Sequence, residues 1–253
     1  MNKRFFLSAA WIIASSVMSP MLYAAEQACD TLVAVEYLSV QPDAATYFDQ
    51  PRQRELNAAL LAKLAEDTQL IFKVDPAQGQ QALRDVQSGR VDLIVGVSDQ
   101  PTKLDQLQYL EPAYAQKIYR LWRRSNEQLA PERWPELSGL RGVEAVPAEH
   151  LLEFKQHAQQ LDWPLSSVES MGSGIDMLLA GEADYVLAEQ QPLQKHVLNH
   201  ELSGELESIE PAVATARLFV AIANDSVCNT AELRKALSAA LQQFNKQKPV
   251  KNQ

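Results

Sequence analysis

Polar and charged side chains follow two strand-like stretches of this 253-residue chain, at the points where the strands should end. These residues come after the stretch 91–97 and at the end of a later, similar stretch: Ser98, Asp99, Thr102, Lys103 and Glu189. In open α/β sheets, ligands bind at the carboxyl ends of the strands. Ammonium, carboxylate and hydroxyl groups at such ends could bind a small polar solute through ion pairs and hydrogen bonds.

The chain shows no recognisable catalytic or metal-binding set. Gly-x-Ser-x-Gly and Walker-type motifs are absent, and the two cysteines and four histidines lack Cys-x-x-Cys or His-Glu-x-x-His spacing. One alternative stays open, because Glu36 and Glu189 could act as an acid and a base across a cleft. We expect a protein that binds a solute without changing it, with no metal and no cofactor.

The two strand-like stretches belong to an internal repeat. Residues 89–95 and 181–187 both read glycine, charged residue, small apolar residue, aspartate and then an apolar run. Each copy follows a helical pattern, at 81–88 and 174–180, and each leads to a Gln-Pro pair that predicts a turn. A helix that ends at glycine with a strand behind it is the second half of a βαβ unit in a parallel sheet.

Further elements precede each copy of the repeat. The first copy follows a strand at 31–37, an amphipathic helix at 52–67 and a strand at 70–74. The second follows a short strand at 142–146 and a helix at 148–161. Two similar units so far apart in the sequence predict two lobes, with a ligand cleft between their strand ends.

Two more strands would connect the lobes. Residues 117–124 are predicted to cross to the second lobe, and residues 216–223 to return before a terminal helix capped by Asn229. The expected fold is α/β and two-lobed, each lobe a mostly parallel sheet flanked by helices, joined by two crossing strands. Lobe 1 would comprise 25–117 and 211–253, and lobe 2 would comprise 118–210.

Three other places are candidate ligand contacts, each with a simpler alternative. Glu36 and Tyr37 end the first strand and could line the cleft or lie on its rim. Tyr114 could stack on a ligand or pack near a hinge. Gly172 and Ser173 are expected to precede a helix, where backbone N–H groups can bind an anion, or to form a serine-capped turn.

The first 24 residues have the pattern of a secretory signal peptide. Lys3 and Arg4 precede the apolar run 5–17, and Leu22-Tyr23-Ala24 supplies the small residue at a cleavage point after Ala24. The residues before Cys29 do not form a lipid-attachment motif, so we expect an unanchored periplasmic protein. Cleavage changes the formal charge from −9 to −11, because the two basic residues leave with no acidic one, and this disfavours nucleic-acid binding.

The mature chain holds two cysteines, one near each end. In an oxidising compartment, Cys29 and Cys228 are expected to form a disulfide, with two buried thiols as the alternative. If they pair, both must lie in lobe 1, which agrees with the discontinuous arrangement.

Four short segments together resemble the family 3 periplasmic solute-binding proteins. They are Leu-Arg-Asp-Val-Gln-Ser-Gly-Arg-Val-Asp at 83–92, Tyr-Leu-Glu-Pro-Ala-Tyr at 109–114, Leu-Ser-Gly-Leu-Arg-Gly at 137–142 and Gly-Glu-Ala-Asp at 181–184. The resemblance implies a monomeric two-lobed trap for a small, amino-acid-like solute, with an ABC permease in the inner membrane as the partner. No nucleic acid is expected to bind.

The same resemblance assigns roles to two residues and shows departures from the family. Lys103 stands where amino-acid-binding members have an arginine for the solute carboxylate, and it lacks the planar fork of arginine. Glu189 stands where the family has an aspartate for the solute ammonium. The second-lobe loop reads Pro147-Ala148-Glu149-His150, and its proline cannot donate a hydrogen bond.

These departures leave two further functions open. One is an accessory or sensory periplasmic protein that keeps the fold without transport, for example one that assists a periplasmic dehydrogenase. The other is a dehydratase-type enzyme on the same fold.

Overall fold

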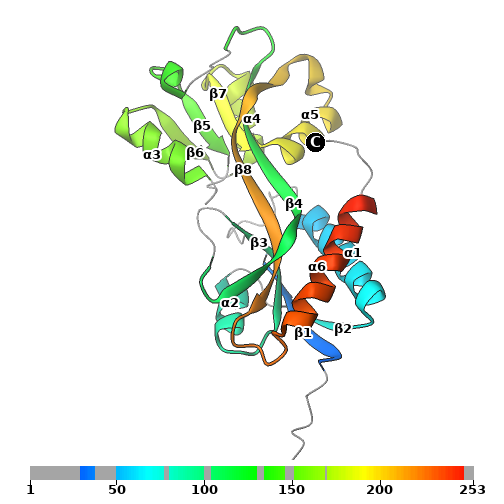
Figure 1. Ribbon diagram of the computed structural model, residues 1–253. Coiled ribbons are helices and arrows are strands. Elements are labelled where there is room, and N and C mark those ends of the chain that lie inside the picture. Colours follow the sequence, from blue (N-terminus) through cyan, green and yellow to red (C-terminus); the bar gives the residue numbers. More distant parts are fainter. Residues whose placement is uncertain are drawn as a thin grey trace, which may run out of the picture.

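The computed structural model describes residues 29–37, 50–76, 80–99, 104–129, 134–145, 151–168 and 170–247. Figure 1 shows two α/β lobes joined by two long strands that run through the length of the molecule. The predicted signal peptide, Thr102, Lys103 and the loop 147–150 lie outside the described residues. The predicted two-lobed α/β class with two crossing strands is confirmed.

Lobe 1 is built around three parallel strands. In chain order it contains β1 (Thr31–Glu36), α1 (Gln50–Thr68), β2 (Ile71–Asp75), α2 (Gln80–Gln87) and β3 (Leu93–Ser98). The strand order is β2-β1-β3, so the middle strand comes first in the sequence. The terminal helix α6 (Ala231–Gln247) returns to this lobe and packs beside α1.

Lobe 2 repeats this arrangement. It contains β5 (Gly142–Ala145), α3 (Leu152–Gln160), β6 (Leu165–Val168), α4 (Met171–Leu179) and β7 (Tyr185–Glu189), with strand order β6-β5-β7. Short 3₁₀ segments, η2 (Trp134–Leu137) and η4 (Leu202–Gly204), flank the lobe, and α5 (Gln190–Asn199) follows β7 directly. The lobes therefore share one β-α-β-α-β topology.

The crossing strands β4 (Leu107–Arg124) and β8 (Leu206–Ala223) join the two parallel sheets into one. They pair with each other in antiparallel fashion, and β8 also pairs with β3 while β4 pairs with β7. The described part of the chain forms one eight-stranded sheet in the order β2-β1-β3-β8-β4-β7-β5-β6. The three parallel strands of lobe 1 (β2-β1-β3) and those of lobe 2 (β7-β5-β6) thus lie on opposite sides of the crossing strands, with the corresponding strands in reverse order.

Both crossing strands are longer than the sequence patterns predicted. The expected strands at 117–124 and 216–223 are only the second halves of 18-residue strands. The first halves contain Glu111-Pro112-Ala113 and Glu210-Pro211-Ala212, each with a cis Glu-Pro peptide at the fifth residue of its strand. The pairing register shifts at both places, and this irregularity interrupts the period-2 pattern that identifies a strand.

The Gly-x-x-Asp repeat proves to be structural. Gly89 and Gly181 have φ values of +70° and +74°, the left-handed conformation that ends α2 and α4. The Oδ2 atom of Asp92 accepts a hydrogen bond from the backbone N–H of Val33 at 2.9 Å, and that of Asp184 accepts from the N–H of Arg141 at 2.7 Å. The aspartate in each copy thus ties the strand that follows it to the neighbouring parallel strand.

The turn predicted at Gln191-Pro192 is wrong. These residues lie in the first turn of α5, which begins at Gln190, directly after β7. Proline suits this position because the first N–H groups of a helix have no partner within the helix. The corresponding Gln100-Pro101 lies outside the described residues.

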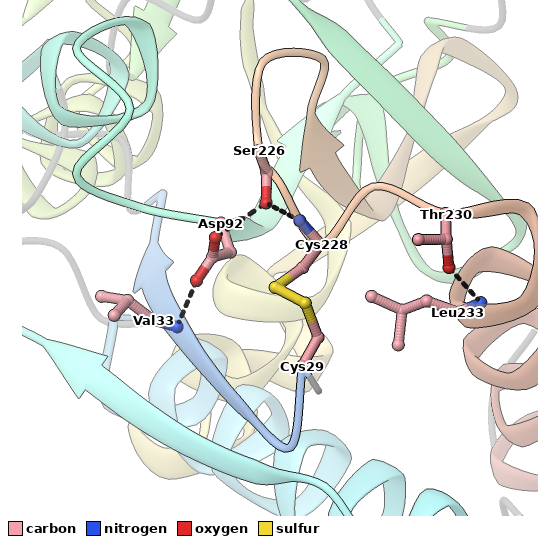
Figure 2. The surroundings of a disulfide bond; sticks show 7 residues. All are labelled: Cys29, Val33, Asp92, Ser226, Cys228, Thr230 and Leu233. Carbon is pink, nitrogen blue, oxygen red and sulfur yellow. Dashed lines mark hydrogen bonds between the residues drawn. A yellow bond between two sulfur atoms is a disulfide. The ribbon is translucent and has the colours of Figure 1, made fainter. Parts of the chain in front are cut away.

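The predicted disulfide is confirmed. Cys29 and Cys228 are bonded, with their Cα atoms 5.6 Å apart, and the bond joins the segment before β1 to the loop before α6. Figure 2 shows how Ser226 supports it, since its hydroxyl donates to Asp92 at 2.7 Å and accepts from the N–H of Cys228 at 3.1 Å. The second segment of lobe 1 is thus fixed to the first.

Replacing both cysteines should destabilise the folded protein markedly. The bond closes a loop of 199 residues in the unfolded chain, so Cys29→Ser/Cys228→Ser should lower the free energy of unfolding by roughly 2–5 kcal/mol. Urea unfolding of the oxidised protein and of the variant measures this. An unchanged midpoint would show that the bond does not constrain the unfolded state.

Removing the charge of Asp184 should destabilise lobe 2 in a pH-dependent way. Hydrogen bonds from the Arg141 side chain and backbone hold the pKa of Asp184 below its ordinary value of 3.8. The contribution to stability is therefore complete above pH 3.8 and is lost as the pH falls through the lowered pKa. We expect Asp184→Asn to cost about 1 kcal/mol at pH 7, because the pair is partly exposed, and less at pH 2, where Asp184 is further protonated.

The exposed Asp225 provides the control for this experiment. Asp225→Asn should leave the unfolding midpoint nearly unchanged at both pH values. Equal effects of the two substitutions at pH 7 would contradict the role given to Asp184.

Candidate functional site

The carboxyl ends of the lobe strands converge on the middle of the crossing strands. Ser98, the last residue of β3, is opposite Leu218 of β8, which is itself opposite Ala115 of β4. Glu189, the last residue of β7, is opposite Tyr119 of β4. The two strand ends thus meet β4 at Ala115 and at Tyr119, which are four residues apart, or about 13 Å at a rise of about 3.3 Å per residue.

Lys117 lies midway along β4 between Ala115 and Tyr119. It is the eleventh residue of β4 and is paired directly with Ala216, the eleventh residue of β8, so the pair marks the centre of the repeated arrangement. Alternation along β4 places Lys117 on the same side of the sheet as Ala115 and Tyr119. Ala115 packs on the core of lobe 1 and Tyr119 belongs to the core of lobe 2, so Lys117 lies between the two cores.

Lys117 forms an ion pair with Glu189. The Nζ atom of Lys117 is 3.6 Å from Oε2 of Glu189, and the two side chains are only 13% and 8% exposed. Charges this far from water are stable only when other charges or hydrogen bonds compensate them. The pair therefore fixes an ammonium and a carboxylate at the carboxyl end of β7.

A second ion pair lies at the carboxyl end of β3. The Nε and Nη2 atoms of Arg217 are both 2.8 Å from Oδ2 of Asp99, and the Arg217 backbone N–H donates to Oδ1 at 3.1 Å. The guanidinium also lies 5.2 Å from the ring centroid of Phe219. Asp99 is 10% exposed and Arg217 is 52% exposed, so the carboxylate orients a cation that faces solvent.

Arg120 lies opposite the irregularity of β8. Its Nε atom donates to Oε1 of Gln190 at 2.9 Å, and its guanidinium forms an ion pair with Glu210. Gln190 begins α5 and Glu210 precedes the cis peptide of β8, so Arg120 connects the end of lobe 2 to the crossing strand.

Glu36 and Tyr37 lie at the carboxyl end of β1, as predicted, and both are partly buried. The backbone N–H of Tyr37 donates to the carbonyl of Val95 at 2.7 Å. The neighbouring Gly96 has a φ of +96°, and a Cβ atom there would lie 2.7 Å from the Tyr37 carbonyl oxygen. The close approach of the two strand ends therefore requires glycine at position 96.

Tyr114 is a core residue of lobe 1, which favours its packing alternative over a ligand contact. Its hydroxyl donates to Oδ1 of Asn57 at 2.7 Å and accepts from Nε2 of Gln53 at 3.0 Å. Burial, together with the nearby negative charge of Glu36, raises the pKa of Tyr114 well above its ordinary value of 10.0. The hydroxyl therefore stays neutral and serves as a hydrogen-bonding group between β4 and α1.

The expectation that Gly172 and Ser173 precede a helix is wrong. Helix α4 begins at Met171, so both residues lie in its first turn. The N-cap is Ser170, whose Oγ accepts from the backbone N–H of Ser173 at 3.0 Å. A glycine-rich first turn reads as a loop, because glycine disfavours helix, but the cap outweighs it here.

The structure thus brings together only some of the predicted site residues. Ser98 and Asp99 lie at one end of the central region and Glu189 at the other, while Thr102 and Lys103 lie outside the described residues. The carbonyl of Ser98 accepts a hydrogen bond from the Tyr109 hydroxyl at 3.1 Å, which fixes the backbone at this end.

Sequence reasoning missed the three cations of the crossing strands: Lys117, Arg120 and Arg217. One signal could have found Lys117. The Glu-Pro-Ala motif occurs at the same position in β4 and in β8. Aligning the two strands on this motif makes Lys117 equivalent to Ala216, the eleventh residue of each strand. Among the described residues, no group of three or more potential metal ligands occurs, and no helix is long and apolar enough to cross a membrane.

No protein-family model and no curated protein matches the chain, whereas solved structures do. A probable amino-acid ABC transporter extracellular-binding protein from Bacillus subtilis superposes with a TM-score of 0.61 at 13% identity, covering 85% of this chain and 92% of its own. The GluR0 ligand-binding core from Nostoc punctiforme, in complex with L-glutamate, gives 0.57 at 13% identity, covering 85% and 93%.

A histidine kinase sensor domain with similarity to periplasmic binding proteins also matches, with a TM-score of 0.57 at 18% identity, covering 85% of this chain and 90% of its own. At these identities the similarity establishes the fold. The resemblance to solute-binding proteins that the sequence predicted is confirmed at that level.

Breaking the Lys117–Glu189 pair should destabilise the protein. Glu189→Ala removes the carboxylate beside a nearly buried ammonium and should lower the free energy of unfolding by about 3 kcal/mol. Lys117→Met/Glu189→Met replaces both charges by apolar groups and should recover most of that loss. Chemical unfolding of the three proteins measures the difference.

Glu205 is an exposed glutamate of lobe 2 and gives the matched control. Glu205→Ala should change the unfolding free energy by less than about 0.5 kcal/mol. A loss in the double variant as large as in Glu189→Ala would contradict the pairing.

Proposed function

We propose that this protein binds a small polar solute between its lobes and does not change the solute chemically. The observation that carries the proposal is the convergence of the β3 and β7 carboxyl ends on the middle of the crossing strands. Their separation along β4, about 13 Å, suits a molecule of amino-acid size. The shared fold with substrate-binding proteins supports the same function.

The proposed motion is closure of the lobes about the crossing strands. The lobe boundaries expected from the sequence, 117/118 and 210/211, fall at Lys117 in β4 and at the cis peptide of β8. A solute that contacts both lobes would favour the closed arrangement, because it makes more contacts there than in the open one.

The proposed contacts come from both lobes. Lobe 1 would supply Glu36, Tyr37, Ser98 and Asp99, with Thr102 and Lys103 from the loop that follows. Lobe 2 would supply Glu189 and the first turn of α4 at Gly172 and Ser173. The crossing strands add Lys117.

We place this function in the periplasm, after removal of residues 1–24, in a monomer that delivers its solute to an ABC permease. A sensory or accessory role is the second candidate, and the similarity to a histidine kinase sensor domain favours it. In both roles the solute binds in the same way. The roles differ only in the partner protein that recognises the closed conformation.

A thermal-shift screen of the mature protein tests the binding step. Organic acids, amino acids and polyamines are added singly, and a ligand at 100 times its dissociation constant should stabilise the protein by about 2.7 kcal/mol. Glu189→Gln should abolish or strongly reduce the response, whereas Glu205→Gln should retain it. Silence across all three compound classes would contradict the proposed function, and turnover of any compound would contradict a purely binding role.

A further inference from the structure

The position of Lys117 indicates which chemical class of solute the site binds. This residue is opposite Ala216 at the centre of the crossing strands, between Ala115 on the core of lobe 1 and Tyr119 in the core of lobe 2. Its ammonium is therefore fixed within the region where the lobes would meet a solute. This inference rests on the proposed function, since it identifies what the same site binds.

The carboxylate of Glu189 already holds an ammonium from the protein itself. Lys117 Nζ is 3.6 Å from Glu189 Oε2, and neither side chain is more than 13% exposed. A solute ammonium that approached Glu189 would meet the positive charge of Lys117 at close range. In a region shielded from water, such like-charge contact is strongly unfavourable.

Displacing Lys117 would not remove this conflict. The backbone of Lys117 pairs with Ala216 of β8, and β4 pairs with β7 from Tyr119 onward, so strand pairing on either side of this position holds the lysine stem in place. An ammonium pushed from Glu189 would lose its ion pair while remaining in a nearly buried position. A solute carboxylate, in contrast, leaves the existing pair in place, because it can accept a hydrogen bond from another of the three ammonium N–H groups of Lys117, on the side away from Glu189.

We propose that the solute is a small organic anion without an amino group, whose carboxylate binds the ammonium of Lys117. Glu189 is a positioning residue that orients Lys117. The site thus differs in ligand class from one that binds α-amino acids, because the protein supplies the ammonium that an amino acid would bring.

Matched pairs of acids test this inference directly. Succinate is compared with L-aspartate and glutarate with L-glutamate, since the members of each pair differ only in the α-ammonium group. Isothermal titration of the mature protein should show at least one of the two deaminated acids binding at least about tenfold more tightly than its amino counterpart. Equal or tighter binding of the amino acids would overturn the inference and leave the proposed function intact.

Three variants locate the effect. Lys117→Arg should retain the preference for the deaminated acid, and Lys117→Met/Glu189→Met, which removes both charges together, should abolish it. Lys155→Met is the matched control, because Lys155 pairs with the buried Glu144 at 2.7 Å in lobe 2, away from the crossing strands. It should lower stability and leave the preference unchanged.

The outcomes separate the two proposals. A preference that survives in the double variant overturns the role of Lys117. Binding of neither acid series overturns the inference, and the thermal-shift screen with other compounds then decides whether the proposed function also fails.

Discussion

The antiparallel pairing of β4 with β8 is the constraint on which the rest of the structure depends. Each strand pairs with its partner over both lobes and also carries the last parallel strand of one lobe, β7 on β4 and β3 on β8. Because these contacts are antiparallel, the carboxyl ends of β3 and β7 must both point to the middle of the pair. The location of the candidate site is therefore a consequence of strand direction.

Charge at this middle region is accommodated by pairing across elements. The cations come from the crossing strands and the carboxylates from the strand ends, as in Lys117 with Glu189 and Arg217 with Asp99. Nearly buried ionic groups are costly unless they are compensated, so the Lys117–Glu189 pair stabilises the contact of β7 with the crossing strands, and Asp99 orients the exposed Arg217 at the end of β3. A solute would thus meet groups that are already oriented, and it would have to be compatible with their existing charges.

The sequence predicted the parts that depend on local patterns. The repeat around Asp92 and Asp184, the two-lobed class and the Cys29–Cys228 bond follow from glycine, aspartate and cysteine placement, and the structure confirms the class and the bond. It did not predict the partners of Lys117, because the register of two 18-residue strands is set by tertiary pairing and the Glu-Pro-Ala irregularities hide their period. The sequence also placed the start of α4 too late. Glycine disfavours helix, so residues 172–174 suggested a loop, but the Ser170 cap stabilises a helical first turn there.

Closure of the lobes around a solute is the central claim, and small-angle X-ray scattering measures it most directly. The mature protein is titrated with succinate or glutarate, whichever binds more tightly, with Lys117→Met/Glu189→Met measured in parallel. The account predicts that the radius of gyration of the unmodified protein falls as the acid saturates it, while that of the double variant stays constant. An unchanged radius of gyration at saturation would contradict the account.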